Sequence, residues 1–305
     1  MSALRETELP VAIAAPDHAE RTESPLAQAI HRLRKSTTAL IGVAIVLGLV
    51  LVAIFADVLA PRSPIDSDQT RTFARPSADY PLGTDQLGRD MLSRVIHGTR
   101  ISLLVGVSSV LLALFVGVPF GMIAGFYGGR IDTGIMRTMD LILAFPIYLL
   151  AIILMVIFTP TAGLIGTMKV TGAIAIVRIP IYARLVRGSV LSIKEKEYIE
   201  ACRALGQRDP WILARHVLPN CLAPIIVTTT LGIATSIIVE ATLSFLGLGT
   251  QPPTPSWGWD LKANVAFIQA NAWLSLFPGI AIFVAVLGFN LFGDGLRDAL
   301  DPRLK

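Results

Sequence analysis

The sequence predicts an all-α membrane protein with six transmembrane helices. Of its 305 residues, 53% are hydrophobic and only 16% are charged, whereas a soluble domain carries about 25% charged residues. The apolar residues also form runs as long as the roughly 20 residues that cross a bilayer. This composition excludes a cytosolic globular enzyme, a disordered protein and a nucleic-acid binder. The two cysteines, Cys202 and Cys221, form no Cys-x-x-Cys pair, so the sequence indicates neither a disulfide framework nor a zinc site.

Five uncharged runs are long enough to cross the membrane, and they comprise residues 36–56, 101–129, 141–168, 217–239 and 263–293. A sixth, weaker candidate lies between residues 163 and 186 and contains Lys169 and Arg178. Lys169 can extend its amine to an interface. A charge deep in the membrane must face protein or water, but the simpler interpretation places Arg178 near the interface on a tilted helix.

The distribution of basic residues predicts the orientation. With six spans, 17 Lys and Arg residues fall on the side of the amino terminus and seven on the other side, while Lys169 and Arg178 lie inside the fourth span. Because cytoplasmic loops carry the excess of basic residues, both termini are predicted to be cytoplasmic. The loop of residues 61–100 holds six arginines and opposes this assignment, but inverting the topology would place the larger basic cluster outside.

These spans divide the chain into parts that we expect as follows: a cytoplasmic, disordered tail (1–35), a first transmembrane helix (36–60), a periplasmic or extracellular loop (61–100), a five-helix core (101–294) containing a cytoplasmic loop (188–216), and a cytoplasmic tail (295–305). Within the outer loop, apolar residues at helical spacing predict an amphipathic segment that lies on the membrane surface. These residues are Leu87, Met91, Leu92, Val95 and Ile96.

The same outer loop contains a glycine spacing that imitates a phosphate-binding loop. Gly83 and Gly88 are separated by four residues, as in that motif. However, Arg89 and Asp90 stand where the motif needs a lysine for the phosphates and a hydroxyl for magnesium. We therefore predict no nucleotide site here.

Between the fourth and fifth spans, the sequence predicts a short helix with a narrow apolar face. Ile199, Cys202 and Leu205 recur every third residue, and Gly206 is a typical helix-ending residue. A short amphipathic helix can dock in a groove of a soluble partner. From periodicity alone, an ordinary solvated helical loop is the simpler interpretation, because most surface helices are amphipathic.

A second helical segment follows at once. Asp209 and Pro210 are suited to a helix start. We expect this segment, residues 211–217, to end at Leu218-Pro219.

The sequence offers little catalytic chemistry. It has neither a His-Glu-x-x-His nor a Gly-x-Ser-x-Gly motif, and its four histidines are isolated from one another. We therefore predict no catalytic residue, cofactor or metal site. Acids near the span ends are expected to be interfacial or helix-pairing residues, and Asp140, at the start of the third span, is expected to complement the helix dipole. The other three acids are Asp57, Glu240 and Asp294.

One constellation resembles a known family. Glu200-Ala201-Cys202, followed by Gly206 and Pro219 at the same spacing, resembles the EAA motif of permease subunits in binding-protein-dependent ABC importers, with Cys202 in place of an alanine. Further segments are similar to the dipeptide, oligopeptide and nickel branch of this family. They comprise residues 83–90, 182–188, 215–220, 240–249, 251–258 and 293–302, and the resemblance covers the chain from about residue 37 to its end.

The resemblance implies a type I importer permease in the bacterial inner membrane. Such a permease pairs with a homologous second permease, two cytoplasmic ATPases and an outside substrate-binding protein, among membrane lipids. It implies that the ATPases hydrolyse ATP, and that residues 200–206 form a coupling helix that sits in an ATPase cleft. The expected coupling residues are Ile199, Glu200, Ala201, Cys202, Leu205, Gly206 and Pro219.

Two questions stay open at this stage. No residue separates dipeptides, longer peptides, glutathione and nickel as substrates. The alternative class of function is an ion- or proton-coupled secondary transporter. Such a transporter would show an internal repeat and acids near the membrane midplane, and neither is visible in the sequence.

Overall fold

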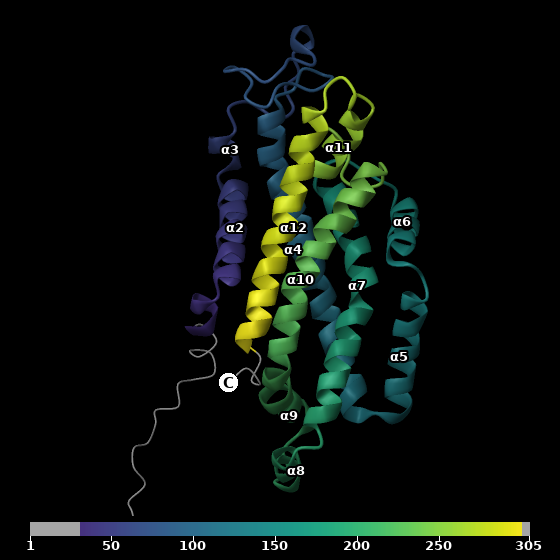
Figure 1. Ribbon diagram of the computed structural model, residues 1–305. Helices are drawn as coiled ribbons and strands as arrows, with labels where there is room; N and C mark the ends of the chain where they lie inside the picture. The colour runs from purple at the N-terminus through teal and green to yellow at the C-terminus, as the bar shows by residue number, and fades with distance from the viewer. Residues whose placement is uncertain (1–30, 301–305) are drawn as a thin grey trace, which may run out of the picture.

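The computed structural model describes residues 31–300, and the regular elements in that range are helices without a β-strand (Figure 1). The long helices are α2 (Thr37–Ile54), α4 (Met91–Tyr127), α7 (Gly163–Ile193), α10 (Leu218–Phe245) and α12 (Trp273–Leu300). The shorter elements are α3 (Ala56–Leu59), η1 (Gln69–Arg71), α5 (Gly129–Leu143), α6 (Ile147–Phe158), α8 (Glu197–Ala204), α9 (Asp209–Ile212), η2 (Leu213–Val217) and α11 (Trp257–Val265). The expected tails lie outside the described residues, except for residues 31–35 and 295–300.

The all-α membrane fold is confirmed. Within residues 31–300, five helical stretches are long and apolar enough to cross a membrane, and α5 with α6 makes a sixth if that pair counts as one span. The sixth candidate of the sequence, residues 163–186, lies within α7. The bundle is flanked by α2 beside α12 at one edge and by α5 and α6 beside α7 at the other (Figure 1).

The prediction of one span over residues 141–168 is wrong. The run contains the end of α5, all of α6 and the start of α7, and α5 and α6 meet at an angle of 88°. Pro146 is the N-cap of α6, and a proline disfavours helical backbone in the residue before it. Thr159 and Pro160 then separate α6 from α7. An uncharged run can therefore contain two interruptions of the helix that hydropathy does not reveal.

Two other boundaries differ from those expected. The run of residues 263–293 starts in α11, and the last long helix begins only at Trp273. The surface-lying segment in the outer loop is also wrong in its placement. Met91 begins α4, and both Met91 and Arg94 are fully buried. Asp90 accepts hydrogen bonds from the amide and hydroxyl of Ser93 and so caps the amino terminus of α4.

The packing of α4 on α7 depends on a row of glycines. Gly117, Gly121 and Gly125 recur every four residues along α4 and face α7. A Cβ atom at Gly121 would lie 2.4 Å from the carbonyl oxygen of Ala183. Small residues at this spacing allow two membrane helices to approach closely, so α4 and α7 pack tightly along this row.

The end of the bundle that carries α11 is closed by buried polar contacts. Nε of Arg94 donates to Oδ1 of Asp260 at 2.7 Å, and its Nη1 donates to the Pro64 carbonyl at 2.9 Å. Burial raises the pKa of Asp260 even though Arg94 faces it. The Trp257 indole donates to the Val95 carbonyl at 2.9 Å. These contacts fix the outer loop, α4 and α11 to one another.

Candidate functional site

The candidate coupling helix α8 lies at the end of the bundle opposite α11 (Figure 1). Ile199 is fully buried and Cys202 is 9% exposed, and both belong to an apolar cluster with residues of α7, η2 and α10. The Arg203 guanidinium lies over the Phe126 ring, 4.9 Å from its centroid. The side chains of Ile199 and Cys202 therefore hold α8 against the bundle.

The outward face of α8 is formed by other residues. Glu200, Ala201 and Leu205 are exposed, and 79% of Leu205 is accessible to solvent. The predicted apolar face of Ile199, Cys202 and Leu205 is therefore wrong at Leu205. Each step of three residues falls about 60° short of a full turn, so Leu205 has rotated away from Ile199 and lies at the end of the helix. The exposed Trp211 on α9 adds a second large apolar side chain to this end of the bundle.

Gly206 ends α8 in the manner that the sequence predicts. Its φ is +76°, a conformation that glycine adopts at little cost. The Gly206 amide donates to the Arg203 carbonyl at 2.9 Å, and the Gln207 amide donates to the Cys202 carbonyl at 3.1 Å. This pair of bonds is a Schellman motif, which sets the direction in which the chain leaves α8.

Beyond this turn, α9 begins at Asp209, as predicted, and the end expected at Leu218-Pro219 is wrong. The helix continues from Asp209 through η2 into α10. The Leu218 amide donates to the Leu213 carbonyl, five residues back, which makes η2 a π-helical turn. Pro219 has no amide hydrogen, so a local π turn lets the helix pass it without ending. Pro219 is exposed in the first turn of α10.

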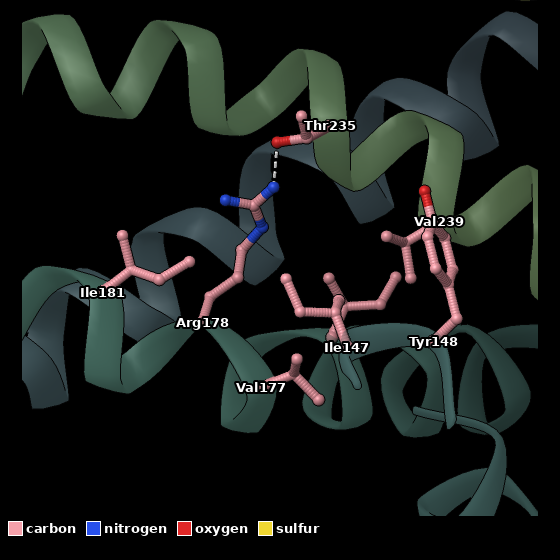
Figure 2. A pocket seen from close by; sticks show the side chains of 8 residues that line it. Ile147, Tyr148, Val177, Arg178, Ile181, Thr235 and Val239 are labelled. Carbon is pink, nitrogen blue, oxygen red and sulfur yellow. Dashed lines mark hydrogen bonds between the residues drawn. The ribbon is translucent and has the colours of Figure 1, made fainter. Parts of the chain in front are cut away.

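A cavity of about 200 Å³ lies between α6, α7 and α10. Arg178 extends into it from the middle of α7 and donates a hydrogen bond to the Thr235 hydroxyl on α10 (Figure 2). Only 8% of Arg178 is exposed, so this charge faces protein, as a charge within a span must when it does not face water. The rest of the lining is mostly apolar: Ile147, Tyr148, Ile174, Val177, Ile181 and Val239.

The acids near the span ends mostly join helices. Glu240 is fully buried and accepts from Ser102 of α4 at 3.3 Å, so the helix-pairing interpretation holds for it. Asp57 pairs with Arg100 at 3.0 Å and so joins α3 to α4. Asp294 is exposed near the end of α12.

The explanation expected for Asp140 is wrong. It lies in the last turn of α5, where a negative charge opposes the helix dipole. Its partner is Arg184 of α7. A second pair, between Asp132 and Arg187, has two hydrogen bonds of 2.5 and 2.6 Å. Ion pairs to α7 therefore explain both acids of α5.

The glycine-rich outer loop is occupied by its own side chains. The Asp85 carboxylate accepts from the amides of Leu87 and Arg89 at 2.8 and 3.0 Å and from the Arg89 guanidinium. These amides are the donors that a phosphate would need. The loop is therefore a folded structural turn, in agreement with the prediction of no nucleotide site.

Within residues 31–300, no three His, Cys, Asp or Glu side chains are arranged to hold a metal ion. The features that the structure presents are instead the exposed face of α8 and the cationic cavity. The face of α8 is exposed at one end of the bundle, and the cavity lies between α6, α7 and α10.

Comparisons with known proteins agree on one family. Residues 117–305 match the model described as binding-protein-dependent transport system inner membrane component, and residues 24–76 match the N-terminal transmembrane domain of oligopeptide transport permease C. The chain is 46% identical to the dipeptide transport system permease protein DppC of Alkalihalophilus pseudofirmus, over 92% of this chain and 91% of that protein.

Two further relatives have related printed names. The di/tripeptide transport system permease protein DppC of Pseudomonas aeruginosa is 45% identical over 92% of this chain and 93% of its own. The glutathione transport system permease protein GsiD of Pectobacterium atrosepticum is 46% identical over 85% of each. Among solved structures, an inward-facing MetNI methionine ABC transporter chain aligns with a TM-score of 0.56 at 19% identity, over 69% of this chain and 98% of that one.

Proposed function

Because the chain belongs to the inner membrane components of binding-protein-dependent transport systems, we propose that it carries di- or oligopeptides through the permease of an ATP-driven importer. It is a multi-pass transmembrane subunit with the type I importer permease fold, and the ATPase is a separate subunit. The peptide substrate is supported by the names of the relatives, which are permease proteins of dipeptide, di/tripeptide and glutathione transport systems.

The observation that carries the mechanism is the two-sided construction of α8. Its inner face, with Ile199 and Cys202, packs on the bundle, while Glu200, Ala201 and Leu205 face outward. Residues of α7 and α10 contact the buried side chains of α8. A displacement of α8 by a partner is therefore transmitted to α7 and α10. We assign the outward face to a groove on a cytoplasmic ATPase. Gly206 and Pro219 shape the chain on either side of η2.

The full assembly contains this chain, a homologous second permease, two ATPases and an outside binding protein. ATP-driven closure of the ATPase pair moves α8, and the bundle alternates between two states that open to opposite sides. In this assignment, residues 188–216 and both termini are cytoplasmic, and residues 61–90 with α11 face the binding protein. The basic residues clustered between residues 184 and 215 support this orientation.

The test of the function is reconstitution. The chain and its partner subunits in proteoliposomes are expected to accumulate a labelled dipeptide only when ATP and the cognate binding protein are both present. Uptake that persists without ATP, driven by an ion gradient, would identify a secondary transporter instead.

Labelling of introduced cysteines in sealed cells is expected to confirm the orientation. Both native cysteines are buried, so they contribute little background. Cysteine at Gln69, in the exposed η1, is expected to react with a membrane-impermeant maleimide from outside. Cysteine at Lys196, which is exposed beside α8, is expected to react only after permeabilisation. Reaction at position 196 in sealed cells contradicts the orientation.

Glu200→Ala is expected to slow transport by only about two- to fivefold. Glu200 is exposed in the first turn of α8, where its carboxylate complements the helix dipole, an interaction worth about 0.3–1 kcal/mol. Uptake rates measured in the reconstituted transporter test this value. Glu200→Gln, which removes the charge but keeps the side chain's length, separates the dipole contribution from contacts to the ATPase.

A further inference from the structure

We propose that Arg178 binds the carboxylate of the transported peptide during its passage through the membrane, an inference that rests on the peptide substrate proposed above. Three observations carry it: a cation without an acidic partner among the described residues, hydroxyl groups near that cation, and a cavity of suitable size and lining between α6, α7 and α10.

Arg178 differs from its neighbours on α7 in having no acidic partner. Arg184 and Arg187 pair with Asp140 and Asp132, whereas no carboxylate of residues 31–300 lies within 4.0 Å of the Arg178 guanidinium. A guanidinium has five N–H donors, and the hydroxyl of Thr235 accepts from one of them. A cation at this depth is strongly destabilising unless an anion or water faces it. The remaining donors of Arg178 are therefore free for a ligand.

A second donor lies beside the guanidinium. A Cβ atom at Gly232 would lie 2.7 Å from the Tyr182 hydroxyl and 3.3 Å from Nη1 of Arg178. The glycine thus leaves room for both polar groups, which lie against it on α10. Tyr182 is fully buried, and its hydroxyl forms no hydrogen bond of normal geometry, although Thr229 lies close to it. Tyr182 itself does not line the cavity; the hydroxyl-bearing side chains in the lining are those of Tyr148 and Thr235 (Figure 2).

The cavity suits one end of a peptide. Its volume of about 200 Å³ corresponds to about seven water molecules at roughly 30 Å³ each, enough for a carboxylate with the residue that bears it. Arginine is planar and binds carboxylates with two parallel hydrogen bonds. Around it, Ile147, Val177 and Ile181 offer apolar walls without sequence-specific donors (Figure 2). Since every linear peptide has a carboxylate at its end, one arginine can recognise peptides of different sequence.

The test uses the reconstituted transporter with its binding protein and two probes, a labelled dipeptide and the same dipeptide with its carboxyl end amidated. Both are supplied at concentrations that saturate the binding protein. Arg178→Gln is expected to slow uptake of the free dipeptide at least about tenfold, as expected for loss of a hydrogen bond to a charged group. Uptake of the amide is expected to change little, so the preference for the carboxylate disappears. Arg178→Lys is expected to retain part of that preference.

Lys169→Gln is the matched control, because Lys169 is the other cation within α7's apolar half and donates only to the Thr159 carbonyl, away from the cavity. It is expected to leave both uptake rates unchanged. Unchanged dipeptide uptake by Arg178→Gln overturns the inference. So does failure of Arg178→Gln to assemble with the second permease, if assembly returns when an acid of that subunit is also neutralised. A wild-type transporter that moves no peptide overturns the proposed function itself.

Discussion

Gly206→Val is expected to abolish transport while the protein remains in the membrane and assembled. Gly206 has a φ of +76°, and a residue with a Cβ atom pays about 1–2 kcal/mol there, a β-branched one more. No atom lies within 4 Å of the Cβ position, so the strain is confined to the backbone of the turn. We expect the valine to break the Schellman motif and change the angle at which α8 leaves the bundle.

The measurement is peptide uptake beside ATP hydrolysis in proteoliposomes. Uptake is expected to fall to background, and ATP hydrolysis is expected to stop responding to the loaded binding protein. Gly188→Val is the matched control, because Gly188 also has open space around its Cβ position but lies within α7 without a positive φ. Gly206→Asn is expected to retain most activity, since asparagine tolerates this conformation. Full transport by Gly206→Val at normal expression would show that the turn has no part in coupling.

The sequence predicts the membrane helices well where charges mark their ends. It fails where apolar loops join them. Residues 144–146 and 159–162 interrupt the run of residues 141–168 without a charge, so hydropathy merges α5, α6 and α7. The informative signals were Pro146 and Pro160, because a proline restricts the residue before it. A proline does not always end a helix, as the continuous helix through Pro219 shows, where a π turn accommodates it.

The sequence predicted the features of the candidate site that depend on neighbouring residues. It did not predict the contacts between residues that are far apart in the chain. Gly206 ends α8 as expected, because the requirement for a positive φ is local. The roles of Arg178 and Asp140 depend on Thr235 and Arg184, which are 57 and 44 residues away. A single sequence does not show which helix faces these charges. The midpoint position of Arg178 in its helix was the available signal, since a charge at depth requires a partner or a ligand.

Arg94→Met is expected to cause a large loss of stability at the end of the bundle that carries α11. Arg94 is fully buried and Asp260 is 1% exposed, with 2.6 Å between Nη2 and Oδ1. Removing the guanidinium leaves a carboxylate in a site where burial already raises its pKa. Removing one partner of a buried ion pair costs about 3–5 kcal/mol. It also removes the hydrogen bond to the Pro64 carbonyl that ties down the outer loop.

Thermal unfolding of the assembled transporter in detergent and protease cleavage within residues 61–90 measure this loss. The double variant Arg94→Met/Asp260→Leu is expected to recover most of the stability, because neither member of the pair is then left buried without its partner. Arg71→Met serves as the exposed control, since Arg71 and Asp79 are 50% and 74% accessible and such a pair contributes about 0–1 kcal/mol. If Arg94→Met and Arg71→Met lower the unfolding temperature equally, the Arg94–Asp260 pair does not hold the outer loop. A double variant less stable than Arg94→Met would instead show that the Asp260 side chain has a separate structural role. That role would be additional to the hydrogen bond that the Asp260 backbone carbonyl accepts from the Asn264 side chain, which the leucine keeps.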